Sequence, residues 1–203
     1  HLMKRVPAAA GLGGGSADAA AMLLGLNKFW DLRLTMDELM TLGAKLGSDV
    51  PFLLKGGTAR GTGRGEELVY HPSPEPHWLL LVKPEISVST AAAYGRYNGK
   101  SNATSDTITN VLHHLEQNDM YGAFTNSANT FEELLFPDHE ELITCKEFFT
   151  SRDYPTIMTG SGPTMVVLLE KPAQALSLQE EIKKAGHNWL SLITKTCTQE
   201  EVQ

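Results

Sequence analysis

Apolar residues recur every three or four positions in the first quarter of the chain, the spacing of one face of an α-helix. The stripe in residues 16–30 predicts a buried helix that begins at Ser16 or Ala17. A second helix is predicted from Thr35, where TMDE has the capping-box pattern, and Gly47 ends it. The apolar positions of the two stripes are Met22, Leu23, Leu26, Phe29, Trp30, Leu39, Leu42 and Leu46.

The pattern changes after the second predicted helix, where apolar residues become continuous. Val50–Leu54 is a short apolar run that we expect to be strand-like. Gly56–Gly65 has glycines at short intervals, which predicts twisted strands or a hairpin rather than a second ligand loop. Three prolines in residues 71–76 then indicate a linker. We therefore expect two domains, residues 1–73 and 74–203.

Strand-like and helix-like segments alternate in the second part of the chain. Apolar runs predict strands at Trp78–Val82 and Trp189–Ile193, and Ile157–Leu169 predicts two strands separated by the turn GSGP. The predicted helices are a segment capped by Ser89-Thr90 that runs through Tyr94, then Ile108–Glu116, Ala128–Leu135 and the amphipathic Pro172–Ala185. This order is typical of an α+β domain with helices on one face of a sheet.

The composition is that of an ordinary globular protein. Of the 203 residues, 41% are hydrophobic and 20% are charged, and the formal net charge is −7. This acidic balance argues against a nucleic-acid backbone or an anionic membrane as the main partner. No apolar run approaches the roughly 20 residues that span a bilayer, and no segment resembles a signal peptide.

Cysteine and histidine usage gives no sign of a metal or disulfide framework. Cys145 and Cys197 lie far apart in the sequence, and the seven histidines show no ligand spacing. We therefore expect a protein of a reducing compartment, the cytoplasm, without metal-ligating side chains.

Residues 7–20 read PAAAGLGGGSADAA and carry the strongest candidate chemistry. Glycine buries no side chain and raises the entropic cost of folding, so four glycines in five positions indicate a backbone that must be bare or adopt positive φ. The helix-forming sequence that follows puts the loop at a helix N-terminus, where unpaired N–H groups and the helix dipole favour an anion such as phosphate. A plain tight turn is the alternative, because the loop is neither a Walker A motif nor a dinucleotide fingerprint.

Two aspartates near this loop have two interpretations each. Asp18, in the first turn of the predicted helix, either shares Mg²⁺ with a bound phosphate or points outward as a helix-end charge, and we favour the outward orientation. Asp49 lies between the second predicted helix and the apolar run. It either caps the backbone before Pro51 or accepts a proton from a hydroxyl beside the phosphate site.

Three stretches in this order resemble the GHMP kinase superfamily, and within it the 4-diphosphocytidyl-2-C-methyl-D-erythritol kinases of the isoprenoid pathway. GLGGGSADAA is similar to the family's GLGGGSSDAA phosphate loop, LGSDVPF to its second motif, and Gly160–Pro163 to its third. Lys83-Pro84, the segment from Val88 to Tyr94 and residues 63–66 fit as well. The resemblance thus extends over nearly the whole chain.

The resemblance implies a two-domain α+β kinase, with an N-terminal domain like ribosomal protein S5 domain 2 and a ferredoxin-like C-terminal domain. It implies that Asp49 is the catalytic aspartate and that Gly160–Gly162 support the loop. ATP, with Mg²⁺, would phosphorylate the 2-hydroxyl of the cytidyl-linked methylerythritol. We expect a small-molecule substrate and a monomer or homodimer. The residues expected to hold ATP are Pro7, Ala8, Ala9, Ala10, Gly11, Leu12, Gly13, Gly14, Gly15, Ser16 and Ala17.

Two features depart from the family pattern. Ala17 replaces the family's second loop serine, so any hydroxyl contact there is lost and Ser16 must serve alone. The sequence begins at His1 without an initiator Met and almost at once reaches the loop. We therefore expect an incomplete N-terminal domain, lacking an upstream segment with strands, a catalytic lysine and much of the substrate pocket. Lys4 does not match that lysine.

Other functions are compatible with these residues. The first alternative is another GHMP kinase, acting on mevalonate, homoserine or a sugar, although GLGGGS and LGSDVPF argue against it. The second is a nucleotide-binding module without turnover, and the third is a glycine-rich structural domain without a ligand.

Overall fold

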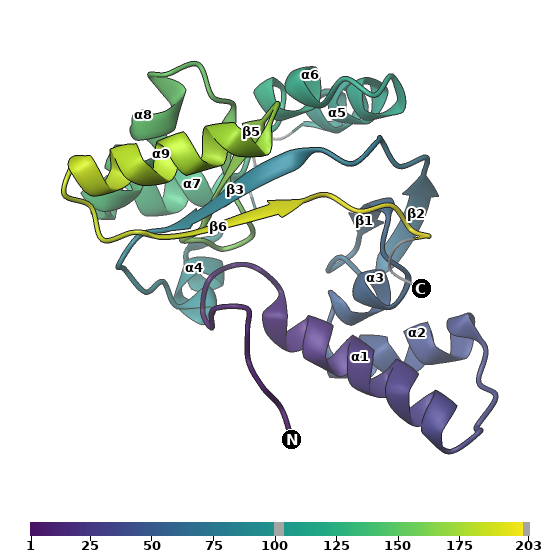
Figure 1. The fold of residues 1–203 in the computed structure, drawn as a ribbon. Coiled ribbons are helices and arrows are strands. Elements are labelled where there is room, and N and C mark those ends of the chain that lie inside the picture. Colours follow the sequence, from purple (N-terminus) through teal and green to yellow (C-terminus); the bar gives the residue numbers. More distant parts are fainter. Residues whose placement is uncertain (100–103, 201–203) are drawn as a thin grey trace. The chain divides into compact units, whose positions relative to one another are not determined.

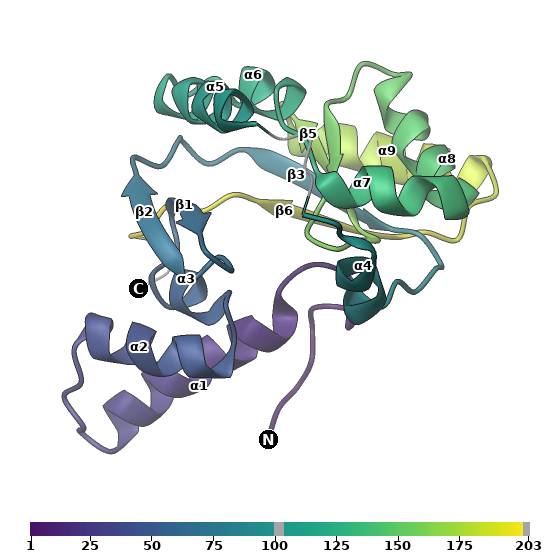
Figure 2. The ribbon, with the colours of Figure 1, turned by 180° about the vertical axis from the view of Figure 1, so that it is seen from behind.

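The computed structural model of the protein describes residues 1–99 and 104–200. The chain folds into two compact units. The first unit comprises His1–Ala8, Gly13–Ser73 and residues 197–200, and the second comprises Ala9–Leu12 and Pro74–Thr196. Figure 1 and Figure 2 show the helices and strands of both units from opposite sides.

Three helices build the core of the first unit: α1 (Gly14–Phe29), α2 (Met36–Leu46) and α3 (Val50–Lys55). Helix α2 begins with the predicted capping box. The Thr35 hydroxyl accepts a hydrogen bond from the Glu38 N–H at 3.3 Å, and the Glu38 carboxylate accepts one from the Thr35 N–H at 2.8 Å. The buried side chains between the helices are Ala20, Leu39, Val50 and Leu54.

Helix α1 corrects the prediction in two respects. It begins at Gly14 rather than at Ser16 or Ala17, with Gly13 as its N-cap in the left-handed conformation. Its buried face centres on Ala20, whereas much of the predicted apolar stripe is exposed. The exposed members of the two stripes are Met22, Phe29, Trp30, Leu42 and Leu46. Helical spacing shows which positions share a face, but it does not show what covers that face.

The apolar run Val50–Leu54 is helical, so the prediction of a strand was wrong. Helix α3 follows Asp49, has Pro51 in its first turn and ends at Gly56, whose φ is 70°. Proline in a first helical turn loses no hydrogen bond. Such a short apolar run has no periodicity that separates a buried strand from a buried helical turn, which is why the sequence pattern misled.

The glycine-rich segment after α3 forms the predicted hairpin. Strands β1 (Thr58–Thr62) and β2 (Glu67–His71) pair antiparallel, with Thr58 opposite His71. Gly63, in the connection, has a φ of 68°, a conformation that glycine adopts without steric cost.

The second unit contains a four-stranded antiparallel sheet with the order β4-β5-β3-β6. Its strands are β3 (Trp78–Lys83), β4 (Thr156–Met158), β5 (Met165–Leu169) and β6 (Leu190–Lys195). In the two central strands, Leu80 lies opposite Val167 and Val82 lies opposite Met165. All four side chains are buried, so they define the core face of the sheet.

Helices α8 (Glu140–Thr150) and α9 (Pro172–Lys184) pack on the sheet, and Figure 1 shows α9 against it. Leu142, Phe149, Leu178 and Ile182 are their largest fully buried side chains. The other helices are α4 (Thr90–Arg96), α5 (Ser105–Glu116), α6 (Met120–Thr125), α7 (Thr130–Leu135) and the 3₁₀ turn Phe136–Asp138. The α+β class is as predicted. The sequence pattern did not indicate α6 and α8, because α6 is one short turn around a glycine and α8 has weak periodicity.

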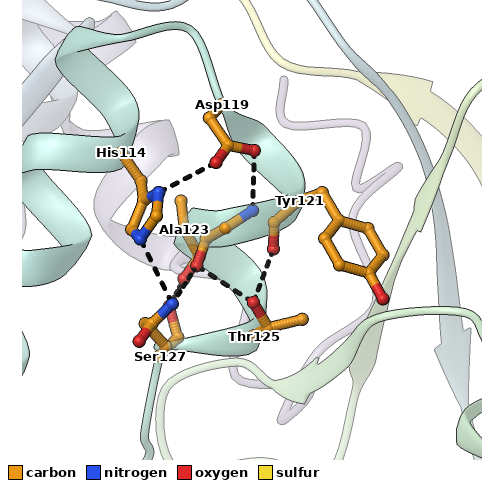
Figure 3. Close-up of polar contacts among 8 residues, drawn as sticks. His114, Asp119, Tyr121, Ala123, Thr125 and Ser127 are labelled. Atoms are coloured by element: carbon orange, nitrogen blue, oxygen red, sulfur yellow. Dashed lines mark hydrogen bonds and ion pairs between the residues drawn. The ribbon is translucent and has the colours of Figure 1, made fainter.

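A polar network joins the end of α5 to α6 (Figure 3). The Asp119 carboxylate lies 2.9 Å from His114 Nδ1 and accepts a hydrogen bond from the Gly122 N–H at 2.8 Å. Asn126 Nδ2 donates to the Gly122 carbonyl at 2.8 Å and lies 3.3 Å from His114 Nε2, which closes the network. The hydrogen bond from Gly122, followed by the one with His114, lowers the pKa of the Asp119 carboxyl group below its usual value.

Candidate functional site

The glycine-rich loop of residues 7–17 is divided between the two units. Ala9–Leu12 belongs to the second unit, and the residues on both sides of this segment belong to the first. Ala9, Gly11 and Gly13 have φ values of 49°, 69° and 63°. Three left-handed residues in five positions give a sharply bent backbone, which explains why the sequence needs glycine here.

In the first unit, the N-terminus of α1 has no side-chain cap. Gly13 is the N-cap, and within the described chain no side chain accepts a hydrogen bond in the manner of a cap. The helical hydrogen bonds begin at Ala17, whose N–H donates to Gly13 O at 2.9 Å. The N–H groups of Gly14, Gly15 and Ser16 therefore lack intrahelical partners, and they lie at the positive end of a 16-residue helix. This arrangement suits an anion.

Gly15 is open on its side-chain face. A Cβ atom built there would meet no atom within 4 Å. The space beside this first turn is therefore not filled by protein.

Asp49 lies at the start of α3, in the same unit as this helix terminus. A Cβ atom built on Gly47, two residues earlier, would lie 3.7 Å from Ser16 Oγ, and one built on Gly13 would lie 3.7 Å from Leu53 Cδ1. The first turns of α1 and α3 are therefore neighbours. Asp49 is exposed.

The Asp49 side chain stabilises no part of the fold that the structure describes. Asp49 is the N-cap residue of α3, yet its side chain makes no capping hydrogen bond. Among residues 1–99 and 104–200 this carboxylate forms no hydrogen bond or ion pair. The structure therefore gives no support to the capping interpretation, and it leaves the carboxylate available to a ligand.

Asp18 is engaged by Lys4 rather than pointing freely outward. The Lys4 ammonium and the Asp18 carboxylate form an ion pair, with side-chain exposures of 40% and 33%. Because α1 begins at Gly14, Asp18 lies in the second helical turn and not, as predicted, in the first. The paired lysine offsets the negative charge that would otherwise oppose a phosphate at the helix terminus.

In the second unit, Gly11 packs against the turn Thr159–Thr164. A Cβ atom at Gly11 would lie 2.4 Å from Thr159 O and 2.8 Å from Gly162 O. The Thr159 hydroxyl donates a hydrogen bond to Gly11 O at 3.2 Å. The loop and the GSGP turn thus meet backbone to backbone, a contact that sequence reasoning expected only through the family resemblance. Thr159 itself was not singled out, and nothing in its local pattern marks it.

The part of the chain that the structure describes holds no preformed cluster of metal-ligating side chains. Within the described residues, no group of three or more histidine, cysteine, aspartate or glutamate side chains could hold a metal ion. The same part of the chain contains no helix with the length and apolar character needed to cross a bilayer.

Comparison with known proteins gives a family match and similar folds. Residues 1–57 match the family described as GHMP kinases N terminal domain. A solved structure titled 4-(cytidine 5'-diphospho)-2C-methyl-D-erythritol kinase superposes with a TM-score of 0.74 at 27% identity, covering 96% of this chain and 69% of that one. A homoserine kinase from Cytophaga hutchinsonii gives a TM-score of 0.73 at 17% identity over 96% of this chain and 68% of that one, which shows the fold alone. The chain is therefore similar to GHMP kinases, and its two compact units have the α+β fold of these solved structures.

Two similar curated sequences carry the same name. The 4-diphosphocytidyl-2-C-methyl-D-erythritol kinase of Exiguobacterium sibiricum is 41% identical over 90% of this chain and 64% of its own length. The protein of the same name from Enterococcus faecalis is 38% identical over 90% of this chain and 65% of its length. The chain thus spans slightly less than two thirds of these relatives.

Proposed function

We propose that this chain carries the ATP-binding loop and the general base of a kinase. The kinase transfers the γ-phosphoryl group of ATP to the 2-hydroxyl of 4-diphosphocytidyl-2-C-methyl-D-erythritol, a step of the non-mevalonate isoprenoid pathway. The shared name of relatives near 40% identity supports this acceptor. The observation that carries the proposal is the juxtaposition of the uncapped N-terminus of α1 with the start of α3, where the Asp49 carboxylate has no partner among the described residues.

The loop residues Pro7–Ala17 bind the phosphates of ATP in this proposal. Phosphoryl transfer depends mainly on positioning and on electrostatic stabilisation of the equatorial oxygens. The N–H groups of Gly14, Gly15 and Ser16, which have no intrahelical partners, provide that stabilisation from a glycine-rich backbone. Asp49 orients the acceptor hydroxyl and takes its proton, a contribution of about 10²–10⁴ in rate.

Mg²⁺ fits this site as an ion held largely by the nucleotide. It commonly keeps several waters and takes one or two protein oxygens beside the phosphates, so the absence of a three-ligand cluster among the described residues is compatible with it. The Ser16 hydroxyl, at the helix terminus, is the protein oxygen that would hold it, which leaves the Asp49 carboxylate to act as the base. When bound, Mg²⁺ neutralises developing charge on the transferred phosphoryl group.

In this proposal the two GHMP domains are residues 1–73 and 74–203. The compact units follow this division except that Ala9–Leu12 belongs to the second unit and residues 197–200 belong to the first. The protein acts in the cytoplasm, as a monomer or a homodimer. These parts of the proposal rest on the family resemblance.

A phosphate-transfer screen of the full natural protein tests the proposal. The acceptors are 4-diphosphocytidyl-2-C-methyl-D-erythritol, mevalonate, homoserine and a sugar, each with Mg-ATP. Transfer to the first acceptor alone is the expected result, and transfer to another would reassign the substrate. Thermal stabilisation by Mg-ATP without transfer to any alcohol would identify a nucleotide-binding module, and no stabilisation at millimolar nucleotide would identify a structural domain.

A further inference from the structure

The turn that packs on Gly11 is fixed by groups outside the GSGP motif. In the turn, Thr159 N donates to Thr164 O at 2.9 Å and Gly162 N donates to Thr159 O at 3.0 Å. These two bonds close the turn on itself. They do not fix where the turn lies relative to the rest of the second unit.

Met158, the last residue of β4, is the point of attachment. Strand β4 lies at the edge of the described sheet, so it pairs with β5 on one side and with no strand of that sheet on the other. Met158 stands opposite Met165, and the next bond of the ladder is made by Thr159. The N–H and C=O of Met158 therefore point away from β5, and a buried edge group of this kind needs another partner.

Asn129 and Glu132 provide these partners from α7. Asn129 Nδ2 donates to Met158 O at 2.6 Å and to Gly160 O at 2.9 Å. The Glu132 carboxylate accepts from Met158 N at 2.7 Å, and its other oxygen is held in an ion pair by Lys146. Two side chains at the N-terminal end of α7 thus bind the edge of β4 that does not pair with β5, immediately before the turn begins.

The amide of Asn129 makes three hydrogen bonds. Its Oδ1 accepts a hydrogen bond from the Phe131 N–H at 2.9 Å and caps α7, which orients both N–H bonds of Nδ2 toward the two carbonyls. These carbonyls flank Thr159, whose hydroxyl binds Gly11 O. Asn129 therefore bonds to the residues on both sides of Thr159, the residue whose hydroxyl contacts the loop.

We propose that Asn129 is a positioning residue for the nucleotide loop. By clamping the carbonyls on both sides of Thr159, it fixes the position of Gly11, two residues before the N-cap of α1. The inference rests on the proposed function. It assigns to α7 a role in ATP affinity although α7 contributes no residue to the loop.

The variant Asn129→Asp separates positioning from folding. Aspartate caps a helix as well as asparagine does, so α7 keeps its bond from Phe131. Both donated bonds are lost, however, and a carboxylate oxygen then faces two carbonyl oxygens. Asn126→Asp is the matched control, because Asn126 also donates its amide to a backbone carbonyl, that of Gly122, at 2.8 Å.

The measurements are the dissociation constant for ATP, the KM of each substrate and kcat, in the full natural protein. We expect Asn129→Asp to weaken ATP binding about tenfold while the KM of the alcohol changes less than about twofold. Asn126→Asp leaves both unchanged. Equal ATP binding by Asn129→Asp and wild type overturns the inference, and so does a parallel loss for both substrates, which indicates a merely structural role.

A second pair of variants covers the case in which Asn129→Asp does not fold. Thr159→Val removes the hydroxyl that binds Gly11 O, and Thr159→Ser keeps it. We expect weaker ATP binding with valine and wild-type binding with serine, and equal binding by the two overturns the inference. A wild-type protein that binds no ATP refutes the proposed function first, and the inference falls with it.

Discussion

Gly11 approaches Thr159 so closely that a Cβ atom at position 11 would lie 2.4 Å from the Thr159 carbonyl oxygen. The two residues are 148 positions apart in the sequence, and the Thr159 hydroxyl donates to the Gly11 carbonyl. The bend of the glycine-rich loop is therefore shaped by a contact within the second unit as well as by its own glycines.

Replacing Gly11 by alanine should destabilise the second unit strongly. The substitution forces alanine into a φ of 69° and drives its Cβ into two carbonyl oxygens. Gly186→Ala is the matched control, because Gly186 has a φ of 81° but a Cβ atom there would meet no atom within 4 Å. We expect a loss of about 1 kcal/mol for Gly186→Ala and roughly 2–4 kcal/mol for Gly11→Ala in urea unfolding. Equal losses would show that Gly11 has room for a side chain.

Gly15 and Gly25 separate helix stability from ligand binding. Both lie in α1, and a Cβ atom on either would meet nothing within 4 Å. Alanine at each position should therefore raise stability by up to about 1 kcal/mol, because glycine is a poor helix former. Only Gly15→Ala should weaken ATP binding, by about tenfold or more, since its methyl group enters the space in front of the free N–H groups. Similar ATP affinities in the two variants would remove Gly15 from the site.

The two cysteines should differ in reactivity. Cys145, on α8, is fully buried in the core, and burial, with a smaller effect of Glu141, raises the pKa of its thiol far above the usual range. Cys197 is exposed. A thiol reagent should modify Cys197 in the native protein and both residues after unfolding in guanidinium chloride. Rapid native modification of Cys145 would contradict the described core.

Acid should weaken the network around Asp119. The pKa of the Asp119 carboxyl group is lower in the folded than in the unfolded protein, so this group stabilises the fold at pH values above its unfolded pKa. The stabilisation is lost as the pH falls through the folded pKa. Asp119→Asn removes that titration, so its unfolding free energy should depend less on pH below about 4 than that of wild type. Asp153→Asn, on an exposed residue of the same unit, should keep the wild-type profile. Identical profiles for all three proteins would show that the network does not titrate.

Local signals allowed much of the fold to be predicted. The capping box at Thr35 and the glycine-spaced hairpin depend on residues close in sequence, and both are observed. The predicted strand at Val50–Leu54 is a helix, because a run this short has no period. Phe29 and Trp30 are exposed although their spacing predicted a buried helix face. Spacing shows which residues share a face of a helix, but only the folded chain shows whether other residues cover that face.

Part of the candidate site could likewise be predicted from local sequence signals, and part could not. The glycine loop and Asp49 could be named from the sequence because each belongs to a short motif. The pairing of Lys4 with Asp18 and the clamp of Asn129 on Met158 could not, since they join residues 14 and 29 positions apart through contacts that no local pattern encodes.

The central claim is that Asp49 is the general base beside an ATP-binding loop. The most direct test is γ-phosphoryl transfer from ATP to 4-diphosphocytidyl-2-C-methyl-D-erythritol by the full natural protein and its Asp49→Asn variant. Asp37→Asn, an exposed aspartate in the first turn of α2, serves as the control. We predict a fall in kcat of about 10²–10⁴ for Asp49→Asn, with ATP affinity and unfolding free energy unchanged, and near-wild-type turnover for Asp37→Asn. Wild-type turnover by Asp49→Asn would contradict the account.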